Sequence, residues 1–119
     1  MFNGNFSDQL NKRNKNNSLK DIVFNRGVER ETLRVSKNGV LSNLPHPQSL
    51  GSPLTNTFIT TDFAEPLIEL VTPKFNSVDS LYSCLEELHV FTAKNISDHE
   101  ILWAYSMPCR INNDKDINI

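Results

Sequence analysis

The feature that most constrains this fold is a predicted β-strand followed closely by a dipeptide that favours tight turns. The segment GVERETLRVS, residues 27–36, is rich in β-branched side chains. It leads into Asn38-Gly39, the dipeptide that two-residue hairpin loops favour because both positions need a positive φ. We therefore expect one strand to approach this turn and a returning strand to start at Val40 and Leu41.

Glu29 and Glu31 lie two residues apart on this predicted strand, so both side chains project from the same face. At a rise of about 3.3 Å per residue, their backbones are about 6.6 Å apart. Leu33 and Val35 continue that face, which makes it charged at one end and apolar at the other. Two such carboxylates can share magnesium, which takes oxygen ligands. The alternative is a solvated strand with glutamate–arginine pairs, and spacing alone favours it because exposed ion pairs are common.

A second group of acids, Asp62, Glu65 and Glu69, lies in the segment TTDFAEPLIELVTP. Their spacing fits a helix, but Pro66 and the β-branched neighbours favour strand. On one unbroken strand Asp62 and Glu69 would face opposite sides, whereas a bend at Pro66 removes that constraint. Glu69 interrupts a strongly apolar run, where a carboxylate is almost never buried unpaired. The residues alone leave a ligand role and exposure at a sheet edge both open.

One long helix and two short strands complete the predicted elements. β-branched residues indicate strand over 57–62 and a short buried strand over 67–71. Asn76 or Ser77 can cap a helix whose apolar residues recur at helical spacing. These apolar positions are Val78, Leu81, Leu85, Leu88 and Thr92. Near the N-terminus, Phe6 and Leu10 could face inward from a short helix, and Leu19 could mark a further turn.

Composition excludes several classes of protein. A chain of 119 residues with a net charge of −2 has room for one domain and has no basic surface for nucleic acid or a charged membrane. It has no apolar run near the ~18 residues of a membrane-spanning helix. The two cysteines match neither a metal-ligand spacing nor a disulfide framework, so we expect reduced thiols in the cytoplasm.

Four segments together resemble the N-terminal part of bacterial glutamate–cysteine ligase, the first enzyme of glutathione biosynthesis. In chain order they are RGVERETLRVSKNG, FITTDFAEPLIELVTP, LEELHVFTAKNI and YSMPC. The resemblance extends from about Lys20 to Ile119, and the two acidic motifs are its specific part. It implies an α+β fold, part of a glutamine-synthetase-like antiparallel sheet with one long helix packed on it. Residues 1–119 would form a single partial domain.

The resemblance also implies an activity. The family joins the γ-carboxylate of L-glutamate to L-cysteine with ATP, through γ-glutamyl phosphate. It uses magnesium or manganese, and the positions that match its metal ligands are Glu29, Glu31, Asp62 and Glu69. The expected partners are glutamate, cysteine and ATP, with no nucleic acid or membrane, in a cytoplasmic protein of undefined oligomeric state. No catalytic side chain is assigned, Glu65 stays open as a ligand, and Arg30 and Arg34 are expected to structure the sheet.

Two departures from the family pattern matter. Pro66 stands where a small residue such as alanine is expected, which could bend the segment between the two acids. Family members are also several hundred residues long, and their later segments supply a histidine ligand, a further glutamate and the cysteine and nucleotide pockets. We therefore expect a fragment that is inactive alone. The alternatives are a related carboxylate–amine ligase of the same fold and a non-catalytic remnant.

Overall fold

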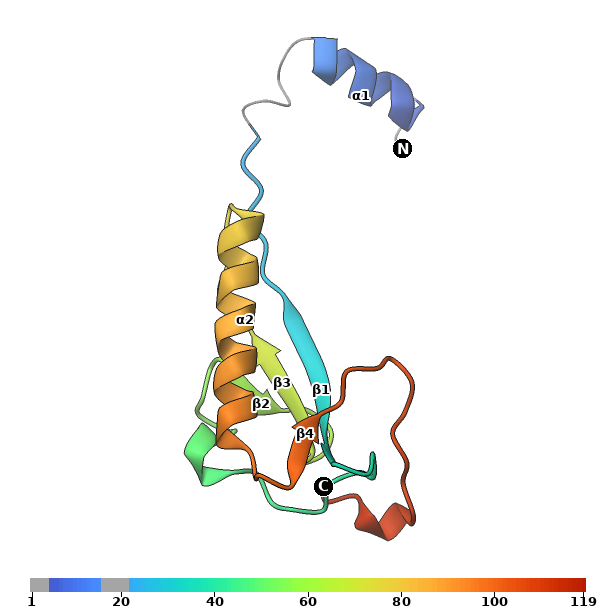
Figure 1. Cartoon of the computed structure of the whole chain (residues 1–119). Coiled ribbons are helices and arrows are strands. Elements are labelled where there is room, and N and C mark those ends of the chain that lie inside the picture. The colour runs from blue at the N-terminus through green and yellow to red at the C-terminus, as the bar shows by residue number, and fades with distance from the viewer. Residues whose placement is uncertain (1–4, 16–21) are drawn as a thin grey trace.

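Within the described residues, 5–15 and 22–119, four antiparallel strands form one sheet in the order β2-β3-β1-β4 (Figure 1). The strands of this computed structural model are β1 (Glu29–Ser36), β2 (Ile59–Thr61), β3 (Leu67–Val71) and β4 (Glu100–Leu102). The predicted α+β class is confirmed, and β3 has its predicted bounds. β2 is shorter than predicted, and β4 was not predicted, because a strand of three residues is too short to show an alternating pattern. The relation to glutamine synthetase stays a prediction.

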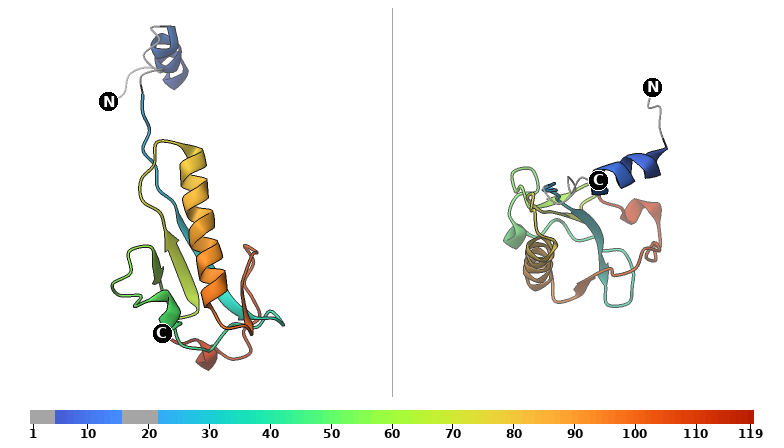
Figure 2. Two further views of the ribbon diagram at one scale, coloured as in Figure 1. Left: turned by 60° about the vertical axis from the view of Figure 1, so that its left-hand side comes forward. Right: turned by 90° about the horizontal axis from the view of Figure 1, so that it is seen from above.

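The long helix α2 (Val78–Asn95) lies lengthwise against one face of the sheet (Figure 2). The hydroxyl oxygen of Ser77 accepts a hydrogen bond from the backbone N–H of Ser80 at 3.4 Å, which confirms the predicted cap. Two short 3₁₀ turns are present: η1 (Gln48–Leu50) lies between β1 and β2, and η2 (Asp114–Asp116) follows β4. None of the helices in the described ranges combines the length and the apolar character needed to cross a membrane.

The N-terminal helix α1 (Phe6–Lys15) lies apart from the sheet (Figure 1). It contains no buried residue, and Phe6 and Leu10 are 75% and 40% exposed. The prediction that these two side chains face inward was therefore wrong. They are the only large apolar residues of a ten-residue helix, which leaves it little apolar surface to bury. Leu19 lies outside the described residues.

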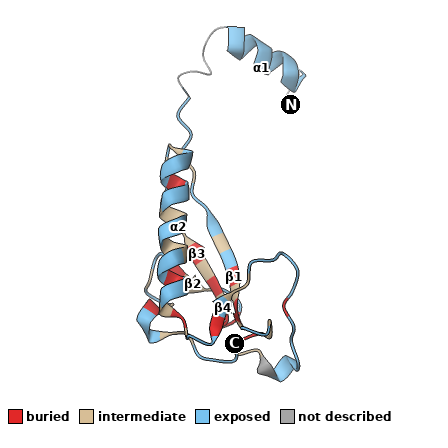
Figure 3. Cartoon of the chain, viewed as in Figure 1, coloured by how far each residue is buried: buried red, intermediate tan, exposed pale blue. Residues whose placement is uncertain are grey.

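Apolar cores form on both faces of the sheet. Figure 3 marks the buried positions of the chain in red. On the α2 face, the buried members are Leu50, Ile59, Ile68, Leu70 and Ile96. On the opposite face, the members are Val35, Leu41 and Cys109, with Leu33, Trp103 and Ile117 packed against them. The glutamate-bearing face of β1 is thus apolar at the end that carries Leu33 and Val35, as the alternation predicted.

The chain turns after β1 where predicted, but over the three residues 37–39 and not over Asn38-Gly39 alone, because the N–H of Ser36 donates to the carbonyl of Val40 at 2.8 Å. Gly39 has a φ of 75°, and its N–H donates to the carbonyl of Ser36 at 2.8 Å. The returning segment pairs with β1 only as a bridge between Val35 and Leu41, so it is shorter than a full strand. The N–H of Leu41 donates instead to the carbonyl of Arg110 at 2.9 Å. The returning segment therefore adds Leu41 to the core around Val35 and Cys109 and does not add a strand to the sheet.

Candidate functional site

The pairing of β1 with β3 brings three predicted ligands together. Glu31 lies directly opposite Glu69, and Glu29 lies two residues before Glu31 on β1. Ile68 and Leu70, the neighbours of Glu69, point into the core beneath α2, so all three glutamates occupy the opposite face. Glu29 and Glu31 are exposed and Glu69 is partly buried. This half of the candidate site therefore has the face predicted from strand alternation.

Asp62 joins the same face because β2 and β3 form a hairpin. Thr60 is the cross-strand partner of Glu69, and Asp62 follows Thr60 by two residues. The chain reverses over residues 62–66, where the N–H of Asp62 donates to the carbonyl of Leu67 at 3.3 Å. Asp62 thus directly follows β2 while Glu69 lies on β3, and the single-strand arrangement that would place the two acids on opposite sides does not occur. The turn that contains Pro66 therefore allows Asp62 and Glu69 to share a face, as a bend at this position was predicted to do.

Among the four carboxylates, the pKa of Glu69 is raised by its surroundings. Partial burial raises the pKa of Glu69, and the negative charges of Glu29, Asp62 and Glu31 raise this pKa further. Glu69 therefore lies in a region of negative potential to which all three other acids contribute. Such a region attracts a cation, and its oxygen-only donors are those that magnesium prefers.

The four acids share a face without forming a closed coordination shell. Across the described part of the chain, no three His, Cys, Asp or Glu side chains are grouped so that they could hold a metal ion. Like charges on one open face repel one another, so they have no reason to converge without a cation. The assignment of metal ligation to Glu29, Glu31, Asp62 and Glu69 stays a prediction.

Arg34 projects from the other face of β1 and is fully buried. Its Nη1 forms a salt bridge with Oε1 of Glu100 on β4 at 2.9 Å, and its Nη2 donates to the carbonyl of Leu44 at 2.7 Å. These contacts join β1 to β4 and to a loop, which confirms that Arg34 structures the sheet. Glu65 lies in the β2–β3 turn, where its carbonyl also accepts from Arg34 at 3.2 Å.

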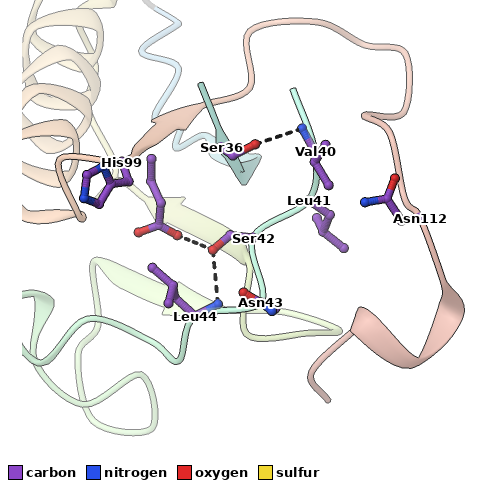
Figure 4. Close-up of a pocket in the computed structure, with 9 residues that line it drawn as sticks. Ser36, Val40, Leu41, Ser42, Asn43, Leu44, His99 and Asn112 are labelled. Carbon is purple, nitrogen blue, oxygen red and sulfur yellow. Dashed lines mark hydrogen bonds between the residues drawn. The ribbon is translucent and has the colours of Figure 1, made fainter. Parts of the chain in front are cut away.

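A hollow of about 430 Å³ lies beside this buried pair (Figure 4). Ser42 projects into it and donates its hydroxyl proton to Glu100, while the N–H of Leu44 donates to the Ser42 oxygen at 3.2 Å. The hollow contains none of the four predicted ligands. Sequence reasoning missed Ser42 and Glu100, because neither lies in an alternating segment or in a recognisable motif.

Comparison with known proteins decides the family. Residues 8–119 match the sequence profile of glutamate–cysteine ligases, which is almost the whole chain. The chain belongs to the glutamate–cysteine ligase family. The predicted family resemblance is therefore confirmed, and the two acidic strands lie inside the matched region.

Several named relatives of this chain are close in sequence. The glutamate–cysteine ligase of Wigglesworthia glossinidia brevipalpis is 51% identical over 79% of this chain. The glutamate–cysteine ligase of Aliivibrio fischeri is 49% identical over the same share. This chain spans 18% of the length of each of these curated relatives and corresponds to an N-terminal portion of them.

Two solved structures share the fold of this chain. A glutamate–cysteine ligase from Francisella tularensis, solved in complex with AMP, superimposes with a TM-score of 0.75 at 46% identity. The match covers 78% of this chain and 18% of that one. A bifunctional glutathione synthetase from Pasteurella multocida gives a TM-score of 0.73 at 30% identity, over 76% of this chain and 12% of that one.

Proposed function

We propose that this chain supplies one wall of the magnesium–ATP site of a glutamate–cysteine ligase. The complete enzyme would join the γ-carboxylate of L-glutamate to the amine of L-cysteine with ATP, through γ-glutamyl phosphate. This is the first step of glutathione biosynthesis. The observation that carries the proposal is the cross-strand pairing of Glu31 with Glu69, with Glu29 and Asp62 on the same face.

The donor set fits the metal. Glu29, Glu31, Asp62 and Glu69 offer only carboxylate oxygens, which suit magnesium or manganese and not a thiolate-seeking metal. When bound, a divalent ion of this kind neutralises phosphate charge and fixes the direction of phosphoryl transfer. The four side chains themselves would hold the ion and place it at a defined point of the sheet. AMP in the Francisella relative supports a nucleotide as the co-substrate.

Residues 1–119 would form a single partial domain, and the other walls of the site would come from the rest of the enzyme. This division follows from the share of the curated relatives that the chain spans, 18%. We therefore propose that the chain alone gives no turnover. Glutamate, cysteine and ATP would be the partners of the complete enzyme. The two free cysteines, Cys84 and Cys109, suit the reducing cytoplasm.

A related ligase is the second candidate. The bifunctional glutathione synthetase from Pasteurella multocida shares the fold of this chain at 30% identity, so the same sheet also occurs in an enzyme with a second activity. The acidic face would serve either enzyme in the same way. The relatives at 49–51% identity are all named glutamate–cysteine ligase, which favours the first candidate.

A chimaera tests the proposal. Residues 1–119 would replace the matching portion of the Wigglesworthia relative, and γ-glutamylcysteine formation would be measured with and without ATP and magnesium. We expect activity that depends on both. Glu29→Ala and Glu69→Ala should each reduce it severely, whereas Glu87→Ala, an exposed position on α2, should leave it unchanged. Full activity in both site variants would refute the metal assignment, and turnover by residues 1–119 alone would refute the partial domain.

A further inference from the structure

The side chain of Arg34 connects four separate segments of the chain. The residue is 0% exposed, and its guanidinium contacts Glu100 on β4, the carbonyl of Leu44 and the carbonyl of Glu65. Such a buried cation is tolerated only where hydrogen bonds and an opposite charge compensate it. Arg34 can therefore stay buried only while its salt-bridge and hydrogen-bond partners remain in place.

One of these guanidinium contacts, together with a hydrogen bond of the Arg34 backbone, reaches the turn between β2 and β3. Nη2 of Arg34 donates to the carbonyl of Glu65 at 3.2 Å, and the backbone N–H of Arg34 donates to the carbonyl of Pro66 at 2.8 Å. Asp62 begins this turn, and Glu69 follows it on β3. Arg34 of β1 thus holds the turn that lies between Asp62 and Glu69.

The anion that holds Arg34 is itself fixed. Oε1 of Glu100 accepts from the Ser42 hydroxyl as well as from Arg34, and Oε2 accepts from the N–H of Ser97 at 3.2 Å. The planar fork of arginine can serve the carboxylate and two carbonyls together, whereas a lysine ammonium on its flexible stem cannot span them. The geometry therefore depends on the guanidinium and not on positive charge alone.

We propose that Arg34 is a positioning residue for the acidic face. By holding the β2–β3 turn against β1, it keeps Asp62 and Glu69 in place relative to Glu31. The consequence for metal binding rests on the function proposed above, whereas the effect on the turn does not. Arg34 itself touches neither metal nor substrate in this scheme, because it projects from the opposite face of β1.

The test compares Arg34→Lys with Ser42→Ala in the full 119-residue chain. Lysine keeps the charge beside Glu100 but loses the carbonyl of Glu65, whereas Ser42→Ala weakens the same cluster and leaves both turn contacts intact. The first measurement is hydrogen exchange at the N–H groups of Asp62 and Leu67, which are hydrogen-bonded within the turn, and of Glu65, which donates from the turn to the carbonyl of Asn118. The second is the dissociation constant for Mn²⁺, followed by electron paramagnetic resonance.

We expect Arg34→Lys to speed exchange at these amides at least tenfold and to weaken Mn²⁺ binding at least fivefold. Ser42→Ala should leave both quantities within twofold of the wild type, although its melting temperature falls. Wild-type exchange rates in Arg34→Lys would overturn the proposal, as would equal weakening of Mn²⁺ binding in the two variants. A purely structural role predicts that Mn²⁺ affinity follows the melting temperature in both.

The two proposals fail in different ways. Glu69→Gln should abolish Mn²⁺ binding and leave exchange in the turn unchanged. If the wild type retains no Mn²⁺, the proposed function fails while the exchange measurement still decides the role of Arg34. If Arg34→Lys does not fold, Arg34→Met combined with Glu100→Leu removes both buried charges together and lacks the Glu65 contact. The same increase in turn exchange is then expected, and its absence overturns the proposal.

Discussion

Glu31 and Glu69 are direct partners across strands β1 and β3, on the sheet face that α2 leaves uncovered. Opposed residues on neighbouring strands have Cβ atoms about 4.5–5.5 Å apart, and two like charges at such a position are destabilising. A fold that places these carboxylates opposite each other loses stability unless a cation neutralises them. This pair is therefore the part of the site that links stability to metal binding.

Removal of one charge from this pair should stabilise the metal-free chain. We expect Glu31→Gln to raise the free energy of unfolding by about 0.5 kcal/mol, as for other cross-strand pairs. The same change should remove most of the stabilisation that added Mg²⁺ gives the wild type. Urea unfolding with and without Mg²⁺ measures both effects. Glu87→Gln on α2 is the charge-matched control, and an equal response in the two variants would argue against repulsion at the pair.

The raised pKa of Glu69 predicts a pH dependence of stability. Between the ordinary value near 4.5 and the raised value, the folded chain holds a proton that the unfolded chain has lost. The free energy of unfolding therefore falls as the pH rises through this window. Glu69→Gln should flatten that fall, because glutamine does not titrate. Unfolding curves at several pH values and low ionic strength give the slope, and an unchanged slope in the variant would contradict the assignment.

The buried pair of Arg34 and Glu100 should be strongly coupled. Arg34→Met leaves the Glu100 carboxylate, 3% exposed, without its cation, and we expect a loss of about 3–5 kcal/mol in stability. Glu100→Leu leaves the opposite charge unpaired and should cost a similar amount. The double variant should cost much less than the sum of the two. Urea unfolding of the four proteins in a double-mutant cycle measures the coupling, and additive losses would show that the charges act independently.

The cap of α2 should contribute a smaller, local stabilisation. Ser77→Ala removes the side-chain acceptor for the N–H of Ser80, and we expect a loss of about 1 kcal/mol. Ser83→Ala, at an exposed position inside the helix, is the matched control and should change stability little. Thermal unfolding followed by circular dichroism compares them, and equal melting temperatures would show that the Ser77 hydroxyl does not cap the helix.

The sequence predicted those elements whose residue pattern is contained within a few neighbouring positions. β1 is a strand of eight residues with Asn38-Gly39 shortly after its end, so the shared face of Glu29 and Glu31 and the position of the turn both followed from the sequence. The common face of Asp62 and Glu69 did not, because it depends on the register between β2 and β3. That register is fixed by a turn without any alternating pattern.

Long-range contacts left no signal in a single sequence. Arg34 and Glu100 are 66 residues apart, and Glu100 lies on a strand of three residues. Nothing in the segment around Glu100 indicates that its carboxylate is buried beside a cation. The family resemblance named the four acids of the candidate site as a set, whereas the network that holds their turn became visible only in the fold.

Anomalous diffraction at the manganese edge tests the central claim most directly. Crystals of the chimaera would be grown with Mn²⁺ and a non-hydrolysable ATP analogue, and the anomalous peaks would be located against the refined chain. The account predicts a peak about 2.0–2.2 Å from carboxylate oxygens contributed by both β1 and β3, Glu31 and Glu69 among them. Manganese bound only to residues outside Glu29, Glu31, Asp62 and Glu69 would contradict it.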